Sequence, residues 1–156
     1  MFTSRSFLLG LGSVALGAVL LTGCASLNRE AGFLPLFDGK TLNGWQLLGG
    51  KGGGYGVKDG VLYCAKGGGG NLLSERDYSD FIFRFEFKLE AGSNNGIAIR
   101  APFAEGSLAY SGMEVQILDD TDPKYAKLKP AQFNGSVYLI AAAKRGALRP
   151  VGEWNE

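Results

Sequence analysis

The sequence predicts an all-β sandwich, and three observations carry this prediction. Apolar residues recur with the period of a strand, most clearly in residues 81–90, and rarely with the period of a helix. The apolar runs are short, and glycine, proline or asparagine separates them. Glycine supplies 25 of 156 residues without the period of three found in collagen, and hydrophobic residues supply 46%. Such a composition is typical of a packed core with many turns.

The chain begins with a predicted export signal. Arg5 precedes an apolar run over residues 7–21, which is too short and too rich in glycine for a comfortable membrane span. This pattern fits the hydrophobic part of a secretory signal, expected over residues 1–23.

The end of this signal resembles the lipobox of bacterial lipoproteins, Leu21-Thr22-Gly23-Cys24. We therefore expect Cys24 to be lipidated and to anchor the chain to a membrane, with residues 24–32 as a tether. Ala25 after the cysteine favours the outer membrane of the bacterial envelope. An ordinary signal peptide with a chance cysteine is the alternative.

A single domain is expected over residues 33–156, and its first clear element is a hairpin. The strands at 55–57 and 60–64 are joined through Asp59-Gly60, a pair favoured in tight turns. The glycine runs on either side, within residues 49–70, are expected to be flexible hairpin loops. They lack the Gly-Lys-Ser/Thr ending and the helix start of a phosphate-binding loop.

Four further strands are predicted downstream, at residues 81–90, 96–100, 113–118 and 136–142. In the first of them, alternation places five apolar side chains on one face and charged side chains on the other. These five are Phe81, Phe83, Phe85, Phe87 and Leu89.

Composition excludes several functions. There is no histidine, so histidine-based triads, proton shuttles and histidine-ligated metals are ruled out. With 16 Lys and Arg against 15 Asp and Glu, the chain lacks the basic surplus of a nucleic-acid binder. With Cys24 lipidated, Cys64 has no disulfide partner, and its apolar run predicts a buried side chain.

Strand alternation also selects candidate functional residues. If strands 96–100 and 113–118 share a sheet, Ile97 and Val115 face the core, and Arg100, Glu114 and Gln116 stand on the opposite face. A cation, a carboxylate and an amide there suit a polyhydroxylated ligand, and glutamate and arginine suit proton transfer and oxyanion stabilisation. A solvated face with a stray ion pair is the alternative.

The acidic run Asp119, Asp120 and Asp122 has the donor atoms that calcium prefers, without a calcium-loop motif. A plain turn is the better interpretation. No cofactor is expected; a divalent metal stays open but is not indicated.

Seven motifs in order resemble the 3-keto-disaccharide hydrolase domain family, over about residues 33–156. They include LFDGKTLNGW at 36–45, SNNGIAIR at 93–100 and GMEVQILD at 112–119. The others lie at 57–62, 78–81, 135–138 and 152–155. The resemblance implies a concanavalin-like jelly roll and an activity on carbohydrates already oxidised at C3.

In the mechanism that the resemblance implies, Glu114 removes the C2 proton and Arg100 stabilises the enolate or carbonyl oxygen. The C1 oxygen leaves, and water adds to the enone. Sugar hydroxyls are oriented by Gln116 and Asp119, Tyr138 lines the cleft, and Asn95 is a weaker candidate.

The family pattern ends at Glu156, where the resemblance implies further strands, so we expect a jelly roll lacking its last strands. Two other functions remain at this point: a surface lipoprotein that binds carbohydrate without turnover, and an inactive truncated copy.

Overall fold

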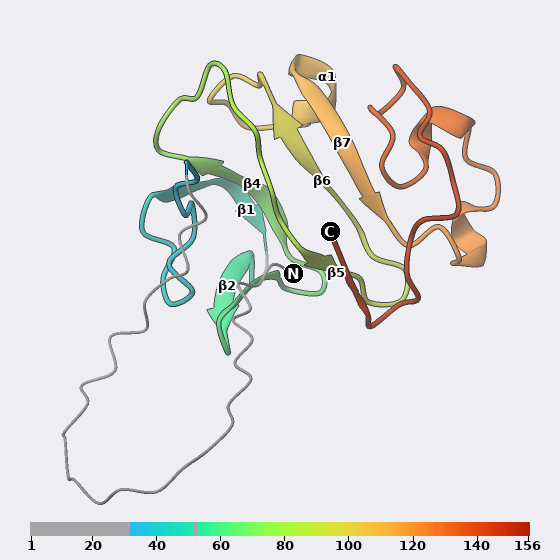
Figure 1. Cartoon of the computed structure of the whole chain (residues 1–156), viewed down its shortest axis with the longest axis horizontal. Helices are drawn as coiled ribbons and strands as arrows, with labels where there is room; N and C mark the ends of the chain where they lie inside the picture. Colours follow the sequence, from blue (N-terminus) through green and yellow to red (C-terminus); the bar gives the residue numbers. More distant parts are fainter. Residues whose placement is uncertain (1–31, 52) are drawn as a thin grey trace, which may run out of the picture.

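A computed structural model describes residues 32–51 and 53–156 (Figure 1). The predicted signal and lipidation site, Cys24, lie outside the described residues. Four antiparallel ladders of two strands each form most of the regular structure, and the prediction of an all-β sandwich is confirmed. Within the described ranges, no helix has the length and apolar character needed to cross a membrane.

The ladders pair β1 with β4, β2 with β3, β5 with β8, and β6 with β7. The elements are β1 (Trp45–Lys51), β2 (Tyr55–Lys58), β3 (Val61–Cys64), β4 (Gly69–Ser74), β5 (Phe87–Lys88), β6 (Asn94–Ile99), α1 (Leu108–Ser111), β7 (Met113–Leu118), two 3₁₀ turns η1 (Pro123–Tyr125) and η2 (Pro130–Gln132), and β8 (Trp154–Asn155).

The core lies where the segment around β5 packs on one face of the β6–β7 ladder. Phe87, Leu89 and Ile117 form a buried cluster, and Ile97 of β6 packs against it. Alternation places Ile97 and Ile117 on the same face of their ladder, so this is the core face predicted from the sequence. The opposite face of β6–β7 is left for other side chains.

The predicted hairpin is confirmed. β2 and β3 pair directly, with Val57 opposite Leu62, and the turn falls at Asp59 and Gly60. Both turn residues have positive φ, 50° and 78°, as the tight turn favoured by Asp-Gly requires. Cys64 ends β3 as a free, partly buried thiol.

The predicted strand over residues 81–90 is right about its faces and wrong about its length. Phe83, Phe85 and Phe87 share one side, with ring centroids 5.0 and 6.0 Å apart in sequence order. Within residues 81–90 only Phe87–Lys88 is a strand, paired with β8, and Phe81 and Ile82 are both exposed, so Phe81 does not lie on the buried face as predicted. Alternation reports which side chains share a face; it does not report whether a neighbouring strand is present.

The glycine runs were predicted to be flexible loops, which is only partly right. Their ends belong to strands of the β1–β4 ladder. Gly70 has φ of 102°, and a Cβ there would lie 2.7 Å from the Leu48 carbonyl oxygen and from Gly50 Cα. Glycine at 70 therefore lets two backbones approach across the irregular part of this ladder, between Leu48 and Lys51.

The strand predicted over 136–142 is also wrong as a continuous element. Val137 bridges Val115 of β7 and then Ala141, which returns the chain on itself. Leu139 takes a positive φ of 60° between them. In Figure 1 the orange chain that follows β7 lies on the side of β7 away from β6, and the red C-terminal end returns to β5, with which β8 pairs.

Candidate active site

The face of β7 opposite the core is flanked on both sides. β6 pairs along one edge, with Ala98 opposite Glu114. Residues 135–138 pair along the other edge, where the Tyr138 N–H donates to the Glu114 carbonyl at 2.8 Å. Since Val115 bridges Val137, Glu114 and Tyr138 occupy directly opposite positions. Side chains in such positions share a face, with Cβ atoms roughly 5 Å apart.

Glu114 occupies a hollow that small residues leave over β6. Its side chain lies over Gly96, where an added Cβ would come 2.5 Å from Glu114 Cγ and Cδ and closer still to Oε1. Gly96 is thus required by this close approach, and Ala98 adds little bulk beside it. Burial raises the pKa of the Glu114 carboxyl. A raised pKa makes a carboxylate a stronger base, which suits proton abstraction.

Tyr138 brings a second proton-carrying group to the same face. Its hydroxyl accepts a hydrogen bond from Gln132 Nε2 at 2.9 Å. Its ring meets Tyr110 of α1 edge to face, with centroids 6.3 Å apart. Tyr138, and to a smaller extent burial and the Glu114 charge, raise the pKa of Tyr110. Glu114, Tyr138 and Tyr110 therefore form one cluster, which we call the carboxylate–tyrosine face.

Gln116 lies on this face but is not open to solvent, contrary to the prediction. Its side chain is 4% exposed, and its Nε2 donates to Asn94 Oδ1 at 3.3 Å. Ser136, 1% exposed, lies opposite Gln116 on the other edge of β7. The sheet face is therefore covered at this end, and sequence alternation could not reveal the covering segment.

Asn95 lies on the other face of the ladder from Glu114. It pairs with Ile117 and shares the side of Ile97, and its Nδ2 donates to the Tyr55 hydroxyl at 3.3 Å. Alternation already places Asn95 with Ile97, so the sequence held the signal that separates it from Glu114.

Arg100 stands beyond the end of β6 and is exposed, with a positive φ of 51°. The guanidinium donates to the Ser79 carbonyl at 3.4 Å, and no ion pair joins it to Glu114, both residues being described. Arg100 follows Ala98 by two residues, roughly 7 Å along a strand. The predicted cation is therefore near the carboxylate–tyrosine face but not directed into it.

Asp119 lies at the opposite end of β7 from Glu114 and is 2% exposed. Burial raises its pKa, but hydrogen bonds from the Thr121 hydroxyl (2.6 Å), the Gly92 N–H (2.8 Å) and the Thr121 N–H (3.0 Å) outweigh burial and lower it. In this structure the carboxylate holds two turns together.

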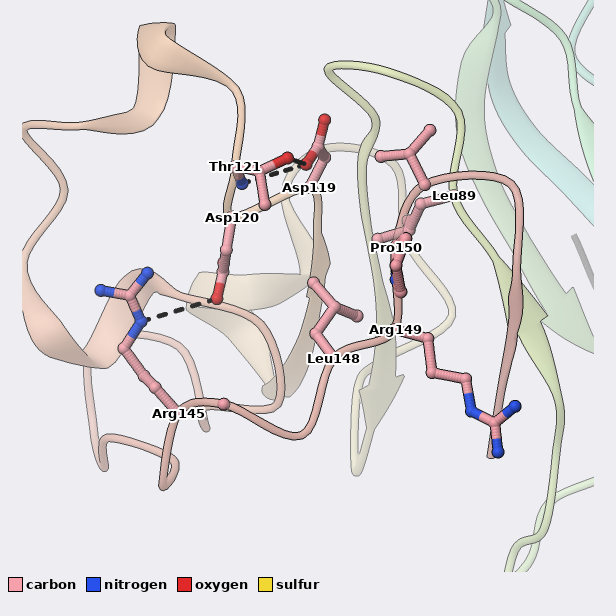
Figure 2. A pocket seen from close by; sticks show the side chains of 10 residues that line it. Leu89, Asp119, Asp120, Thr121, Arg145, Leu148, Arg149 and Pro150 are labelled. Atoms are coloured by element: carbon pink, nitrogen blue, oxygen red, sulfur yellow. Dashed lines mark hydrogen bonds and ion pairs between the residues drawn. The ribbon is translucent and has the colours of Figure 1, made fainter.

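A cavity of about 400 Å³ lies beside Asp119 (Figure 2). Figure 2 shows the Asp119–Thr121 contact at the top, the Asp120–Arg145 ion pair, 3.7 Å long, below it, and the side chains of Leu148 and Pro150 to the right of the ion pair. A second cavity, about 420 Å³, lies between β1, β4 and residues 105–106. Glu114 lines neither of these two cavities, and beside it Ala98 and Tyr110 are exposed.

The acidic run serves turns rather than a shared centre. Asp120 accepts from the Asn134 N–H, and Asp122 accepts from the Lys124 N–H at the start of η1. In the described part of the chain, no group of three or more His, Cys, Asp or Glu is arranged to hold a metal ion.

Two contributors to the face were missing from the predicted site. Gln132, which holds the Tyr138 hydroxyl, reaches it only because η2 and residue 138 fold together, and no local sequence signal shows this. Tyr110 is visible in the sequence as an aromatic residue suited to sugar stacking, but its position beside Tyr138 depends on α1.

The chain is thus a β-sandwich protein in which the carboxylate of Glu114 and the rings of Tyr138 and Tyr110 lie together on one face of a sheet. A model of the 3-keto-alpha-glucoside-1,2-lyase-like domain family matches residues 32–156. The chain belongs to this family, as its motifs predicted.

Relatives agree with this assignment. A 3-keto-disaccharide hydrolase of Bacteroides thetaiotaomicron is 28% identical over 154 residues, covering 80% of this chain and 51% of the relative. The chain thus spans about half the length of this curated relative. A crystal structure from Parabacteroides distasonis, provisionally described as a glycosyl hydrolase, superposes with a TM-score of 0.56 at 22% identity, covering 76% of this chain and 58% of the other. That likeness concerns the fold alone.

Proposed function

We propose that the chain cleaves 3-keto-glycosides on the carboxylate–tyrosine face. The observation that carries the proposal is the Glu114 carboxylate, partly buried over Gly96 with a raised pKa and directly across from Tyr138. A ketone at C3 acidifies the proton on C2, so a carboxylate base is strong enough to remove it. Membership of the lyase-like family makes this class of substrate the natural one.

The reaction begins when Glu114 takes the C2 proton and the electron pair forms an enolate with the C3 carbonyl. Arg100 stabilises the enolate oxygen in this proposal. Its present hydrogen bond to Ser79 is long, 3.4 Å, and exposed, so little is lost when the guanidinium turns to substrate. Collapse of the enolate expels the C1 oxygen, and addition of water to the enone completes a net hydrolysis.

The test uses the full chain with 4-nitrophenyl 3-keto-α-glucoside, followed by absorbance of the released nitrophenol, and the unoxidised glucoside as a negative substrate. We expect Glu114→Gln to lower kcat/KM by about 10²- to 10⁴-fold, the usual contribution of a general base. Glu75→Gln, at an exposed carboxylate away from the face, is the matched control and should keep full activity.

Full activity in Glu114→Gln would show that Glu114 is not the base that removes the C2 proton. Retention of the protein on immobilised glycans without turnover of any 3-keto-glycoside would instead favour a carbohydrate-binding protein. Tyr110 suits that second function because it is 72% exposed and presents a ring for sugar stacking.

The same proposal places the chain at the bacterial envelope through a lipid on Cys24. The lipobox-like segment Leu21-Thr22-Gly23-Cys24 supports it. Labelling of expressing cells with a radioactive fatty acid tests it. Label should appear on the chain and disappear in Cys24→Ala, and label retained by that variant contradicts the anchor.

A further inference from the structure

We propose that Tyr138 is the acid that protonates the departing C1 oxygen and later activates the water, with Gln132 as the residue that positions it. This inference rests on the proposed function and assigns the second half of its proton transfers. The base alone does not complete the reaction, because an alkoxide expelled from C1 is a poor leaving group unless it receives a proton as the bond breaks.

The first step of the argument is placement. Tyr138 and Glu114 are held opposite each other by a backbone hydrogen bond of 2.8 Å, and the adjacent Gln116 N–H donates to the Ser136 carbonyl at 2.9 Å. These two backbone hydrogen bonds therefore hold the Cα atoms of Tyr138 and Glu114 opposite each other whether or not a substrate is bound. C1 and C2 of a sugar are neighbouring atoms, so an acid and a base at directly opposite positions of one face can serve both.

The second step is the direction of the Tyr138 proton. Gln132 Nε2 donates to the Tyr138 oxygen at 2.9 Å, and the orientation of that amide is set because Gln132 Oε1 accepts from the Lys129 N–H at 3.0 Å. The Tyr110 ring lies edge to face with the Tyr138 ring, with centroids 6.3 Å apart, and so borders the side of Tyr138. The Tyr138 oxygen thus accepts from the Gln132 amide, which leaves the proton of its own hydroxyl to be donated.

The third step is the balance of the reaction. Glu114 takes the C2 proton, C1–O breaks as the C1–C2 double bond forms, and the Tyr138 hydroxyl gives its proton to the leaving oxygen. Tyrosinate then takes a proton from water as the water oxygen bonds to C1. The electron pair returns through the enolate, and the Glu114 carboxylic acid gives its proton back to C2. Both residues end as they began, and no further reactant is needed.

The experiment compares two substrates that differ in their need for an acid. Methyl 3-keto-α-glucoside expels a strongly basic alkoxide, whereas 4-nitrophenyl 3-keto-α-glucoside expels a weakly basic phenolate. We expect Tyr138→Phe to lose about 10²- to 10⁴-fold in kcat/KM on the methyl glycoside and less than about tenfold on the nitrophenyl glycoside. Tyr63→Phe, the control at a tyrosine of β3 outside the carboxylate–tyrosine face, should leave kcat/KM unchanged on both substrates.

A second readout separates Tyr138 from the base. In heavy water, exchange of the C2 proton of the methyl glycoside should continue in Tyr138→Phe and stop in Glu114→Gln. Gln132→Leu should show the leaving-group dependence of Tyr138→Phe with a smaller loss, as expected of a positioning residue.

Three results would overturn the inference. They are an equal loss on both substrates in Tyr138→Phe, no loss on either, or loss of C2 exchange in that variant. If the unmutated chain turns over neither substrate, the proposed function itself has failed, and this outcome is distinct because it does not depend on Tyr138.

Discussion

Glycine allows a close approach of backbone in the β1–β4 ladder and a close approach of a side chain in the β6–β7 ladder. At Gly70 the missing side chain lets one backbone approach another, since the nearest atoms to an added Cβ are Gly50 Cα and the Leu48 carbonyl oxygen. At Gly96 it makes room for a side chain, because the atoms in that space belong to Glu114. The first ladder therefore needs glycine for folding, and the second needs it for placement of a functional group.

The largest expected effect breaks the first ladder. Gly70→Ala should lower the free energy of unfolding by about 3 kcal/mol, because the Cβ meets backbone atoms at 2.7 Å and φ is 102°. Urea unfolding followed by tryptophan fluorescence measures the change. Gly69→Ala is the control, since nothing lies within 4 Å of its Cβ. An equal loss in both variants contradicts the assignment of a close approach at Gly70.

The next largest effect is expected when a side chain is added at Gly96, beside Glu114. Gly96→Ala should displace the Glu114 carboxylate and lower kcat/KM on 3-keto-glycosides by about 100-fold, or about 2.7 kcal/mol. The Cβ also crowds Glu114, so the free energy of unfolding should fall by about 1 kcal/mol. In a Glu114→Ala background this stability loss should vanish. A loss that persists there places the clash elsewhere.

A smaller effect concerns the turn at the far end of β7. Asp119→Asn should lower the free energy of unfolding by about 2 kcal/mol at neutral pH, because charge-assisted hydrogen bonds to Thr121 and Gly92 are weakened. The lowered pKa of Asp119 means that its stabilisation is present above the unfolded pKa and is lost as pH falls through the folded pKa. The variant and the unmutated chain should therefore converge in acid.

Asp119→Asn also separates structure from substrate binding. If the carboxylate only holds turns, KM for a 3-keto-glycoside should stay unchanged in the folded variant, whereas a raised KM supports the predicted contact with sugar hydroxyls. Asp77→Asn, at an exposed carboxylate, is the control for both measurements.

The smallest effect is the pH dependence of Glu114. Its pKa is raised in the folded chain, so the folded state holds this proton more tightly than the unfolded state. The stabilisation is present below the unfolded pKa and is lost as pH rises through the folded pKa. Glu114→Gln should accordingly be more stable than the unmutated chain at neutral pH, and this advantage should shrink in acid. A constant difference across pH contradicts the raised pKa.

Local patterns predicted the faces of strands better than their neighbours. The alternation in residues 81–90 correctly placed Phe83, Phe85 and Phe87 together, but the hydrogen-bonded strand is only Phe87–Lys88. Pairing depends on a second segment, β8, that lies far along the chain. The limits of β7, Met113–Leu118, were predicted because both the apolar alternation and the flanking residues agree.

The candidate site was predicted in part for the same reason. Glu114 stands on the predicted face, since alternation within β7 decides that. The burial of Gln116 and the nearness of Tyr138 arise from residues 135–138 pairing with β7, and that contact joins segments with no shared local signal. Asp119 lies at the other end of β7 because it directly follows Leu118, the last residue of the strand, and this position could be predicted from the limits of the strand.

Attachment of Tyr138 to β7 through main-chain atoms has an evolutionary consequence. A main-chain hydrogen bond does not depend on the side chain at position 138. A substitution there therefore changes the chemical group opposite Glu114 and keeps its position. Opposite Glu114, selection is thus free to explore hydroxyl, imidazole, amide or apolar groups one substitution at a time. The group opposite Glu114 can therefore change without any change in the backbone that holds it.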